Sequence, residues 1–226
     1  MSSLLAIVAE PDAASLAGLD GGFEWGEAVT AAPGAVPDAD VVLALGQDGI
    51  LTEDGALLSR AAWPVRDDLF EAPAPAGRQL LVVTGDGDRH AGLLAKLADR
   101  GIPHGTVAAP SAADVLAAAV VAFPPSPGAD GKYVPDSHGD AVPARAFAAL
   151  AARRPLILPR ARTTFGLLPG VDHLAASTDD EIVQYAAALL GHPDAFRIQV
   201  ALGAIAAERQ RASVVYGRLA AELAAR

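Results

Sequence analysis

The chain has 226 residues, a length that fits one large domain or two small ones. It has no cysteine, which excludes disulfide bonds, thiolate nucleophiles and cysteine-ligated zinc. Its formal net charge of −10 argues against a protein that binds nucleic acid or an anionic membrane through its overall field. No unbroken apolar run approaches the ~20 residues of a membrane span, and the first residues lack the basic segment of a secretory signal. These features predict a cytoplasmic protein.

The acidic residues are concentrated in the N-terminal third. Residues 1–77 contain 13 acidic and 2 basic side chains, whereas residues 140–226 contain 8 acidic and 10 basic ones. The C-terminal part can therefore hold a site for a small anionic ligand despite the acidity of the whole chain. The acidic third also has a simpler explanation, namely that it keeps the protein soluble.

Two apolar runs, Leu4–Ala9 and Val41–Leu45, predict strands in the N-terminal third. A further strand is expected over Phe23–Val29. A short helix is expected between Pro11 and Leu19, and the Pro-Ala-Pro-Ala segment at 73–76 is the best candidate for a linker. We expect residues 1–77 to form a short acidic α/β lobe, or further strands of the sheet in the second domain.

From residue 78 onward, short apolar runs alternate with helical patterns. The predicted strands are Gln79–Thr84, a short one at Val107, Val120–Phe123 and Leu156–Leu158. The predicted helices run from Gly85–Asp88 to Gly101, over Ser111–Ala119, Pro143–Ala152 and Asp179–Leu190, and over 194–224 with an interruption near Gly203. This alternation predicts an α/β fold with a Rossmann-like parallel sheet and helices on both faces. The intervening segment 124–143, rich in Pro, Gly and Asp, is expected to be a long loop.

The segment Gly85-Asp86-Gly87 lies between a predicted strand and a predicted helix. Parallel sheets bind ligands at the carboxyl ends of their strands, and a helix N-terminus offers amide groups to a phosphate. Arg89 adds a guanidinium that can contact the phosphate directly. Asp86 and Asp88 oppose an anion, however, and the segment lacks both the GxGxxG and the P-loop patterns. It is therefore either a phosphate cradle or a capped tight turn.

A second candidate site surrounds the start of the helix expected near Ala141. The N-terminus of this helix and the side chain of Arg145 are suited to a diphosphate. His138 and Asp140 precede the helix and are candidates for acid–base catalysis. The simpler explanations are an N-cap for Asp140 and a solvated loop position for His138.

Arginines also follow the strand Leu156–Leu158, again at a carboxyl end. Arg160 and Arg162 are candidate ligands for an anion, although surface arginines need no function. Arg153 and Arg154 are expected at a helix C-terminus, where a positive charge suits the helix dipole. The remaining histidines lack metal-ligand spacing and no GxSxG elbow is present, so neither a metal site nor an acyl hydrolase is predicted.

The order of these features from Arg78 onward resembles the C-terminal, donor-binding domain of GT-B glycosyltransferases, in particular the group-1 and spore-coat-type families. The segments that carry the resemblance are QLLVVTGDGDRHAGLLAKLADRGI, SAADVLAAAVVAFPPS, PARAFAALAARRPLILPR and TFGLLPG with TDDEIVQYAAALLGHPD. The resemblance implies that residues 78–226 bind a nucleoside-diphosphate sugar as substrate, with no further cofactor. It also implies that Arg160 faces the donor cleft.

The chain departs from the pattern of these families. Members carry two glutamates eight positions apart around the fourth helix, and the corresponding residues here are Asp140 and Ala148. In these families a glycine usually follows the Ala-Leu-Ala run, but here that position is Arg153. The N-terminal lobe is also shorter than the acceptor domain of these families. We therefore expect a glycosyltransferase-like protein with weak or lost transfer, or else a non-catalytic nucleotide-binding or interaction subunit with a GT-B-like fold. A homo-oligomer and a partner glycosyltransferase subunit both stay open.

Overall fold

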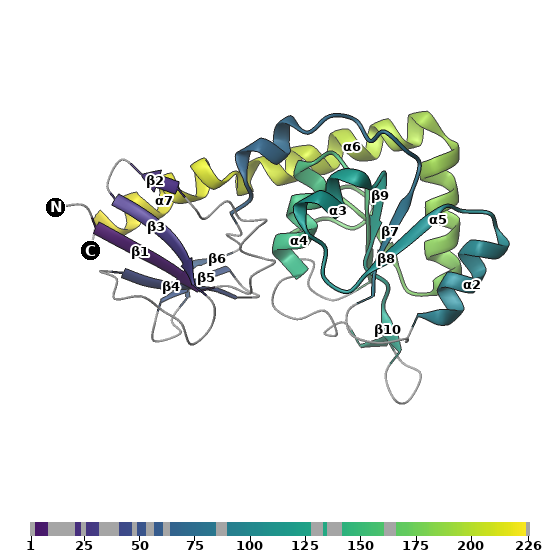
Figure 1. Cartoon of the computed structure of the whole chain (residues 1–226), viewed down its shortest axis with the longest axis horizontal. Coiled ribbons are helices and arrows are strands. Elements are labelled where there is room, and N and C mark those ends of the chain that lie inside the picture. Colours follow the sequence, from purple (N-terminus) through teal and green to yellow (C-terminus); the bar gives the residue numbers. More distant parts are fainter. Residues whose placement is uncertain are drawn as a thin grey trace.

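The computed structural model describes residues 3–8, 21–23, 26–31, 41–46, 49–52, 57–60, 64–84, 90–127, 133–134, 142–160 and 166–224. Side chains are described within 64–84, 90–125, 145–160 and 166–219. Figure 1 shows two β-sheets at the two ends of an elongated molecule, connected along one side by a run of helices near the C-terminus. Both chain termini lie at the end that holds the N-terminal sheet.

The N-terminal third forms a mixed six-stranded sheet of its own. Its strands are β1 (Ser3–Val8), β2 (Gly21–Phe23), β3 (Gly26–Ala31), β4 (Val41–Gly46), β5 (Gly49–Thr52) and β6 (Leu57–Arg60). The order is β2-β3-β1-β4-β5-β6, with β1 parallel to β3 and β4 and the other pairs antiparallel. The alternative that these strands extend the second sheet is therefore wrong.

Two of the expected N-terminal strands are confirmed, and the third is corrected. β1 and β4 occupy the expected runs, whereas the run Phe23–Val29 divides into the antiparallel strands β2 and β3. Phe23 pairs with Gly26, so the chain reverses within a run that had been expected to be continuous. The helix expected between Pro11 and Leu19 lies outside the described residues.

The second sheet confirms the Rossmann-like α/β fold. It consists of β7 (Leu80–Val83), β8 (His104–Val107), β9 (Val120–Ala122), β12 (Leu156–Pro159) and β13 (Leu174–Ala176). All of its neighbouring strands are parallel, and their order is β13-β12-β9-β7-β8. β13 was not predicted, because three residues are too few to show a pattern. A small antiparallel pair, β10 (Ser126–Pro127) and β11 (Tyr133–Val134), lies within the segment expected to be a loop.

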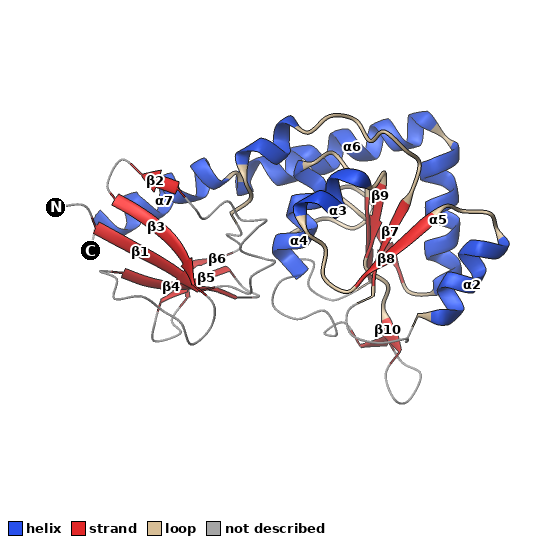
Figure 2. Cartoon of the chain, viewed as in Figure 1, coloured by secondary structure: helices blue, strands red, loops and turns tan. Residues whose placement is uncertain are grey.

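Helices cover both faces of this sheet, as Figure 2 shows. α2 (Ala91–Asp99) and α5 (Asp179–Gly191) pack on one face, and α3 (Ala112–Ala117) and α4 (Val142–Ala151) on the other. Alternate residues of β7 supply the two cores: Leu80 and Val82 face the first pair of helices, and Leu81 and Val83 the second. A strand with two buried faces needs a continuous apolar run, which explains why β7 is the clearest strand in the sequence.

α4 is enclosed on all sides. It contacts β12, α3, the short helix η1 (Asp67–Glu71) and α6 (Pro193–Ala207), and residues 146–152 are all buried. Its alanines permit this close packing. At Gly203 of α6, a Cβ atom would lie 2.6 Å from the Leu150 side chain, so a larger residue would force that side chain to shift. The expected interruption near Gly203 is therefore wrong: α6 is continuous, and the break is the 3₁₀ turn η2 (Glu208–Gln210) before α7 (Ala212–Ala224).

Residues that precede the expected linker also pack in the second core. Val65, Leu69 and Phe70 belong to the apolar cluster that includes β7, β9 and α4. The backbone of Val65 bonds to both sides of the η2–α7 junction, through the Gln210 carbonyl at 2.7 Å and the Ala212 N–H at 2.8 Å. The guanidinium of Arg211 lies 4.0 Å above the ring of Phe70. These contacts join the two segments of chain that run toward the N-terminal sheet.

His173 introduces a dependence of stability on pH. It is fully buried just before β13, and neither ring nitrogen has a hydrogen-bond partner within the described part of the chain. Burial lowers the pKa of His173, and the neighbouring charge of Asp172 offsets this only in part. The unfolded chain therefore binds a proton more readily than the folded one, so acid favours unfolding.

We expect the free energy of unfolding to fall as the pH decreases below about 6.5, the ordinary pKa of histidine. His173→Leu should remove this part of the pH dependence. It should also raise stability at pH 7 by about 1 kcal/mol, because no buried ring nitrogen is left unpaired. Urea unfolding between pH 5 and pH 8 measures both effects, with the exposed His192→Gln as control. An identical slope in the parent and in His173→Leu would contradict the assignment.

Candidate functional site

The strand order of the second sheet contains one topological switch point. From β7 the chain moves outward to β8 and then returns past β7 to β9, so the direction of winding reverses between β7 and β9. In open parallel sheets, ligands bind outside the carboxyl ends of the strands at such a switch point. The segment Gly85-Asp86-Gly87 follows β7, and the segment from Phe123 onward follows β9.

Backbone hydrogen bonds fix the described residues at this edge of the sheet, which we call the floor of the candidate site. At the end of β7, the N–H of Thr84 donates to the Val107 carbonyl at 2.9 Å. At the end of β9, the N–H of Phe123 donates to the Ile157 carbonyl at 2.9 Å, which continues the pairing with β12. Phe123 and the two prolines that follow it are buried. The floor between β7 and β12 is therefore apolar and has little backbone freedom.

Two of the helices that begin at this edge are closed by their own side chains. In α3, Ser111 and Asp114 form a capping box, with the Ser111 N–H donating to the Asp114 carboxylate at 2.8 Å. In α5, Thr178 accepts from the Glu181 N–H at 3.2 Å, and three acidic residues occupy the first turn. Because these carboxylates already complement the positive ends of the helices, neither terminus is suited to an anionic ligand.

The other two helices differ, and they follow the two strands of the switch point. α2 begins after His90, whose side chain makes no capping bond, and its first turn has no acidic residue. The first turn of α4 also has no acidic residue and instead carries Arg145. Helix N-termini that lack carboxylates retain their partial positive charge toward an incoming anion. The first turns of α2 and α4 therefore place no carboxylate of their own at this edge, although the Asp179 carboxylate of α5 lies 3.7 Å from the Cβ position of Gly92 in α2.

Arg145 is the best placed of the sequence-predicted residues. Its side chain is only 6% exposed, although it lies in the first turn of α4, where the helix dipole opposes a positive charge. A buried guanidinium at such a position requires polar partners, and Arg145 already interacts with other groups of the chain. Arg160 follows β12 at the same edge of the sheet, and its side chain is exposed. Its N–H donates to the Ala176 carbonyl at 2.8 Å, so its backbone is fixed by β13.

The remaining sequence-predicted site residues lie outside the described residues. They are Gly85, Asp86, Gly87, Arg89, His138 and Asp140, together with Arg162. The position that corresponds to the second family glutamate is described: Ala148 is fully buried within the apolar cluster around α4. The difference between the acidic first turn of α5 and that of α4, which has no acidic residue, was not predicted. It can be recognised in the sequence, because Thr-Asp-Asp-Glu at 178–181 is typical of an acidic helix N-terminus.

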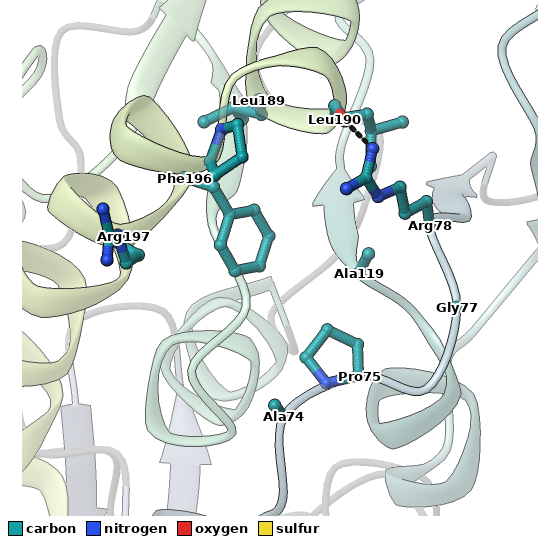
Figure 3. A pocket seen from close by; sticks show the side chains of 10 residues that line it. Ala74, Pro75, Gly77, Arg78, Ala119, Leu189, Leu190, Phe196 and Arg197 are labelled. Carbon is teal, nitrogen blue, oxygen red and sulfur yellow. Dashed lines mark hydrogen bonds between the residues drawn. The ribbon is translucent and has the colours of Figure 1, made fainter.

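A pocket lies at the opposite, amino edge of the sheet, and Figure 3 shows it. Its volume is about 240 Å³, and Pro75, Ala119 and Phe196 contribute to its largely apolar wall. Arg78 borders it and donates to the Leu190 carbonyl at 3.4 Å, at the end of α5. This volume is below the ~300–1,000 Å³ of typical ligand pockets. Neither Arg145 nor Arg160 lines this pocket, so it does not coincide with the expected site.

Comparison of the sequence with protein-family models and with curated proteins found no match. Among the described helices, none is both long and apolar enough to cross a membrane.

Proposed function

We propose that the second domain binds a nucleoside-diphosphate sugar at the carboxyl edge of its parallel sheet, as a glycosyltransferase-like protein. The diphosphate would lie between the N-termini of α2 and α4, and Arg145 would neutralise part of its charge. Arg160 would contact the ligand from the end of β12. His138 and Asp140 would be the candidates for acid–base work on the transferred sugar.

One observation carries this proposal: of the four described helices that begin at this edge of the sheet, the two without acidic first turns are the two that flank the topological switch point. A protein that only required a stable α/β scaffold would gain from acidic residues at every helix N-terminus, as α5 does. Leaving two adjacent termini without them, with a buried arginine beside one, suits an anionic ligand. Donor phosphates are stabilised by the same groups as the leaving nucleotide departs.

The second candidate function is a non-catalytic nucleotide-binding or interaction subunit. It is favoured by Ala148, because an alanine methyl accepts no hydrogen bond from a ribose hydroxyl and this residue is fully buried. Titration with UDP and GDP tests binding, and release of nucleoside diphosphate from nucleotide sugars tests turnover. Binding without turnover would favour the second candidate, whereas efficient turnover would exclude it.

Arg145→Ala is expected to weaken the binding of UDP or GDP by about tenfold or more. The loss of one charge-assisted contact is worth roughly 1.5–3 kcal/mol. Arg145→Lys should lie between the parent and the alanine variant, because lysine keeps the charge but not the planar, bidentate guanidinium. Isothermal titration calorimetry on each variant gives the dissociation constants.

The matched control is Arg100→Ala, an exposed arginine at the C-terminal end of α2 and therefore at the other edge of the sheet. It should leave the dissociation constant unchanged. Since Arg145 is buried, thermal unfolding of each variant establishes that it is folded at the temperature of the titration. A folded Arg145→Ala protein that binds as tightly as the parent would contradict the role of Arg145. A parent that binds neither nucleotide would contradict the function itself.

A further inference from the structure

One face of α6 is apolar and exposed to solvent. Ile198, Ala201, Leu202 and Ile205 follow the spacing i, i+3, i+4, i+7, which places them along one side of a helix. Ile198 is 61% exposed and Ile205 is 69% exposed, among the highest values for large apolar residues in the described part of the chain. We call these four residues the α6 outer face.

The domain itself does not need this face. α6 is held by its other side, where Gln199, Gly203 and Ala207 are buried. The Gln199 amide donates to the Val171 carbonyl at 2.8 Å, and Gly203 abuts Leu150 of α4. An isoleucine more than half exposed at two positions of one helix face is therefore not explained by packing within the chain.

The loop that adjoins α6 enlarges the apolar surface. Val171, whose carbonyl accepts the Gln199 bond, is 41% exposed, and Leu168 in the same loop is 60% exposed. Several exposed apolar residues on one helix and its neighbouring loop are more typical of an interaction site than single scattered apolar residues are. The four residues of the α6 outer face are all uncharged, which is also typical of the core of a protein interface.

The sequence of the face is complementary to itself when two copies of α6 run antiparallel. A two-fold axis between Ala201 and Leu202 places Ile198 of one helix opposite Ile205 of the other, and Ala201 opposite Leu202. Such a pairing is isologous, because each contact is made twice by the same two residues. A small residue opposite a larger one at the centre lets the two helices approach closely and interlock.

The charges beyond the apolar residues fit the same register. The axis places Asp194 of one copy opposite Arg209 of the other, and Arg197 within one turn of Glu208. Asp194 and Arg197 already form an ion pair on their own helix, as do Glu208 and Arg211. Asp194, Arg197 and Glu208 remain exposed in these pairs, whereas Arg211 is half-buried, so a second copy can add contacts to the three exposed groups. A parallel arrangement of the two helices would instead place each charged residue next to the same residue of the other copy, and so next to a like charge.

We propose that the α6 outer face is a homodimer interface, in which two copies of the chain associate through antiparallel α6 helices. α6 has 15 residues. It is therefore about 22 Å long, so the helix pair alone is at the small end of specific interfaces. The dimer is accordingly weak and forms reversibly with concentration.

Analytical ultracentrifugation of the full chain, from about 1 µM to about 500 µM, tests the association in the range expected of a small interface. Mass should rise with concentration toward that of a dimer. Ile205→Glu should raise the dissociation constant at least tenfold, and Ile198→Glu likewise, while circular dichroism stays that of the parent because both side chains are exposed. The control Ala187→Glu, at an exposed position of α5, should not change it. A monomer at every concentration, or a dimer that survives both isoleucine variants, would overturn the proposal.

The register is tested by charge reversal. Asp194→Arg alone and Arg209→Asp alone should each weaken the dimer about threefold or more, because each opposes like charges across the interface. The double variant should restore the parental dissociation constant. If the double variant is as weak as the singles, the antiparallel register is wrong.

The relative orientation of the two α6 helices is tested by disulfide crosslinking. Because the chain has no native cysteine, only the introduced cysteines can form a disulfide. Ala201→Cys lies beside the axis, so oxidation should link two copies. Ala195→Cys lies on the same helix, but in an antiparallel pair its two copies are roughly 20 Å apart along the axis. It should not crosslink. Equal crosslinking of both variants would indicate parallel helices and would overturn the antiparallel pairing.

Discussion

Replacing Ala148 by glutamate is expected to lower the free energy of unfolding by more than about 3 kcal/mol, because the new carboxylate is buried without a cation and overpacks the core. Ala148 is fully buried, and the helix α4 around it is enclosed by β12, α3, α6 and η1. Glutamate adds the heavy atoms of a long side chain where only a methyl group fits. The carboxylate would also lie among apolar side chains such as Phe147 and Leu150.

Thermal and urea unfolding of Ala148→Glu measure this loss. Ala187→Glu, the same substitution at an exposed position of α5, is the matched control and should change stability by less than about 0.5 kcal/mol. A variant that is folded, as stable as the parent and tighter for UDP or GDP would show that position 148 borders the nucleotide. In that case the glutamate would have restored a donor contact, and Ala148 would belong to the binding site rather than to the core.

The central strands β7, β9 and β12 of the second sheet were predictable because they are buried on both faces. The continuous run Leu80–Val83 and the helical patterns beside it define an α/β unit without any tertiary information. β13 and the pair β10–β11 were not predictable in this way, since two or three residues show no period. Likewise, nothing in the run Phe23–Val29 distinguishes one strand from the antiparallel pair β2 and β3.

The candidate site was predictable only in part. The switch point depends on the order of the strands in the sheet, which cannot be deduced from the sequence alone. The glycines after β7 and the arginine of α4, by contrast, can be recognised directly in the sequence. The burial of Arg145 depends on how α4 packs, and α4 is surrounded by elements from four different parts of the chain. The same limit applies to Arg154. Its position after a predicted helix indicated a role at the end of that helix, but its side chain reaches a different one.

Arg154→Met is expected to destabilise the fold by roughly 2–4 kcal/mol, since it removes hydrogen bonds from a charged donor and leaves one buried and two partly buried carbonyls without this partner. Arg154 is 1% exposed. Its guanidinium donates to the carbonyls of Val115 and Leu116 at 3.4 and 2.9 Å, at the end of α3, and to the carbonyl of Pro73 at 3.1 Å. Burial lowers the pKa of Arg154, and these three carbonyls together with the negative end of the α3 dipole offset that penalty.

Methionine retains most of the side-chain volume, so the loss reports the hydrogen bonds rather than a cavity. Arg154→Lys should lose less than Arg154→Met, because one ammonium keeps the charge but cannot reach three carbonyls in the geometry of a guanidinium. Urea unfolding of both variants, with the exposed Arg100→Met as control, gives the comparison. A loss of less than about 0.5 kcal/mol in Arg154→Met would mean that water replaces the guanidinium at these carbonyls. The residue would then be dispensable for holding the segment at Pro73 against α3, and the joint between that segment and the second domain would rest on Val65, Leu69 and Phe70 alone.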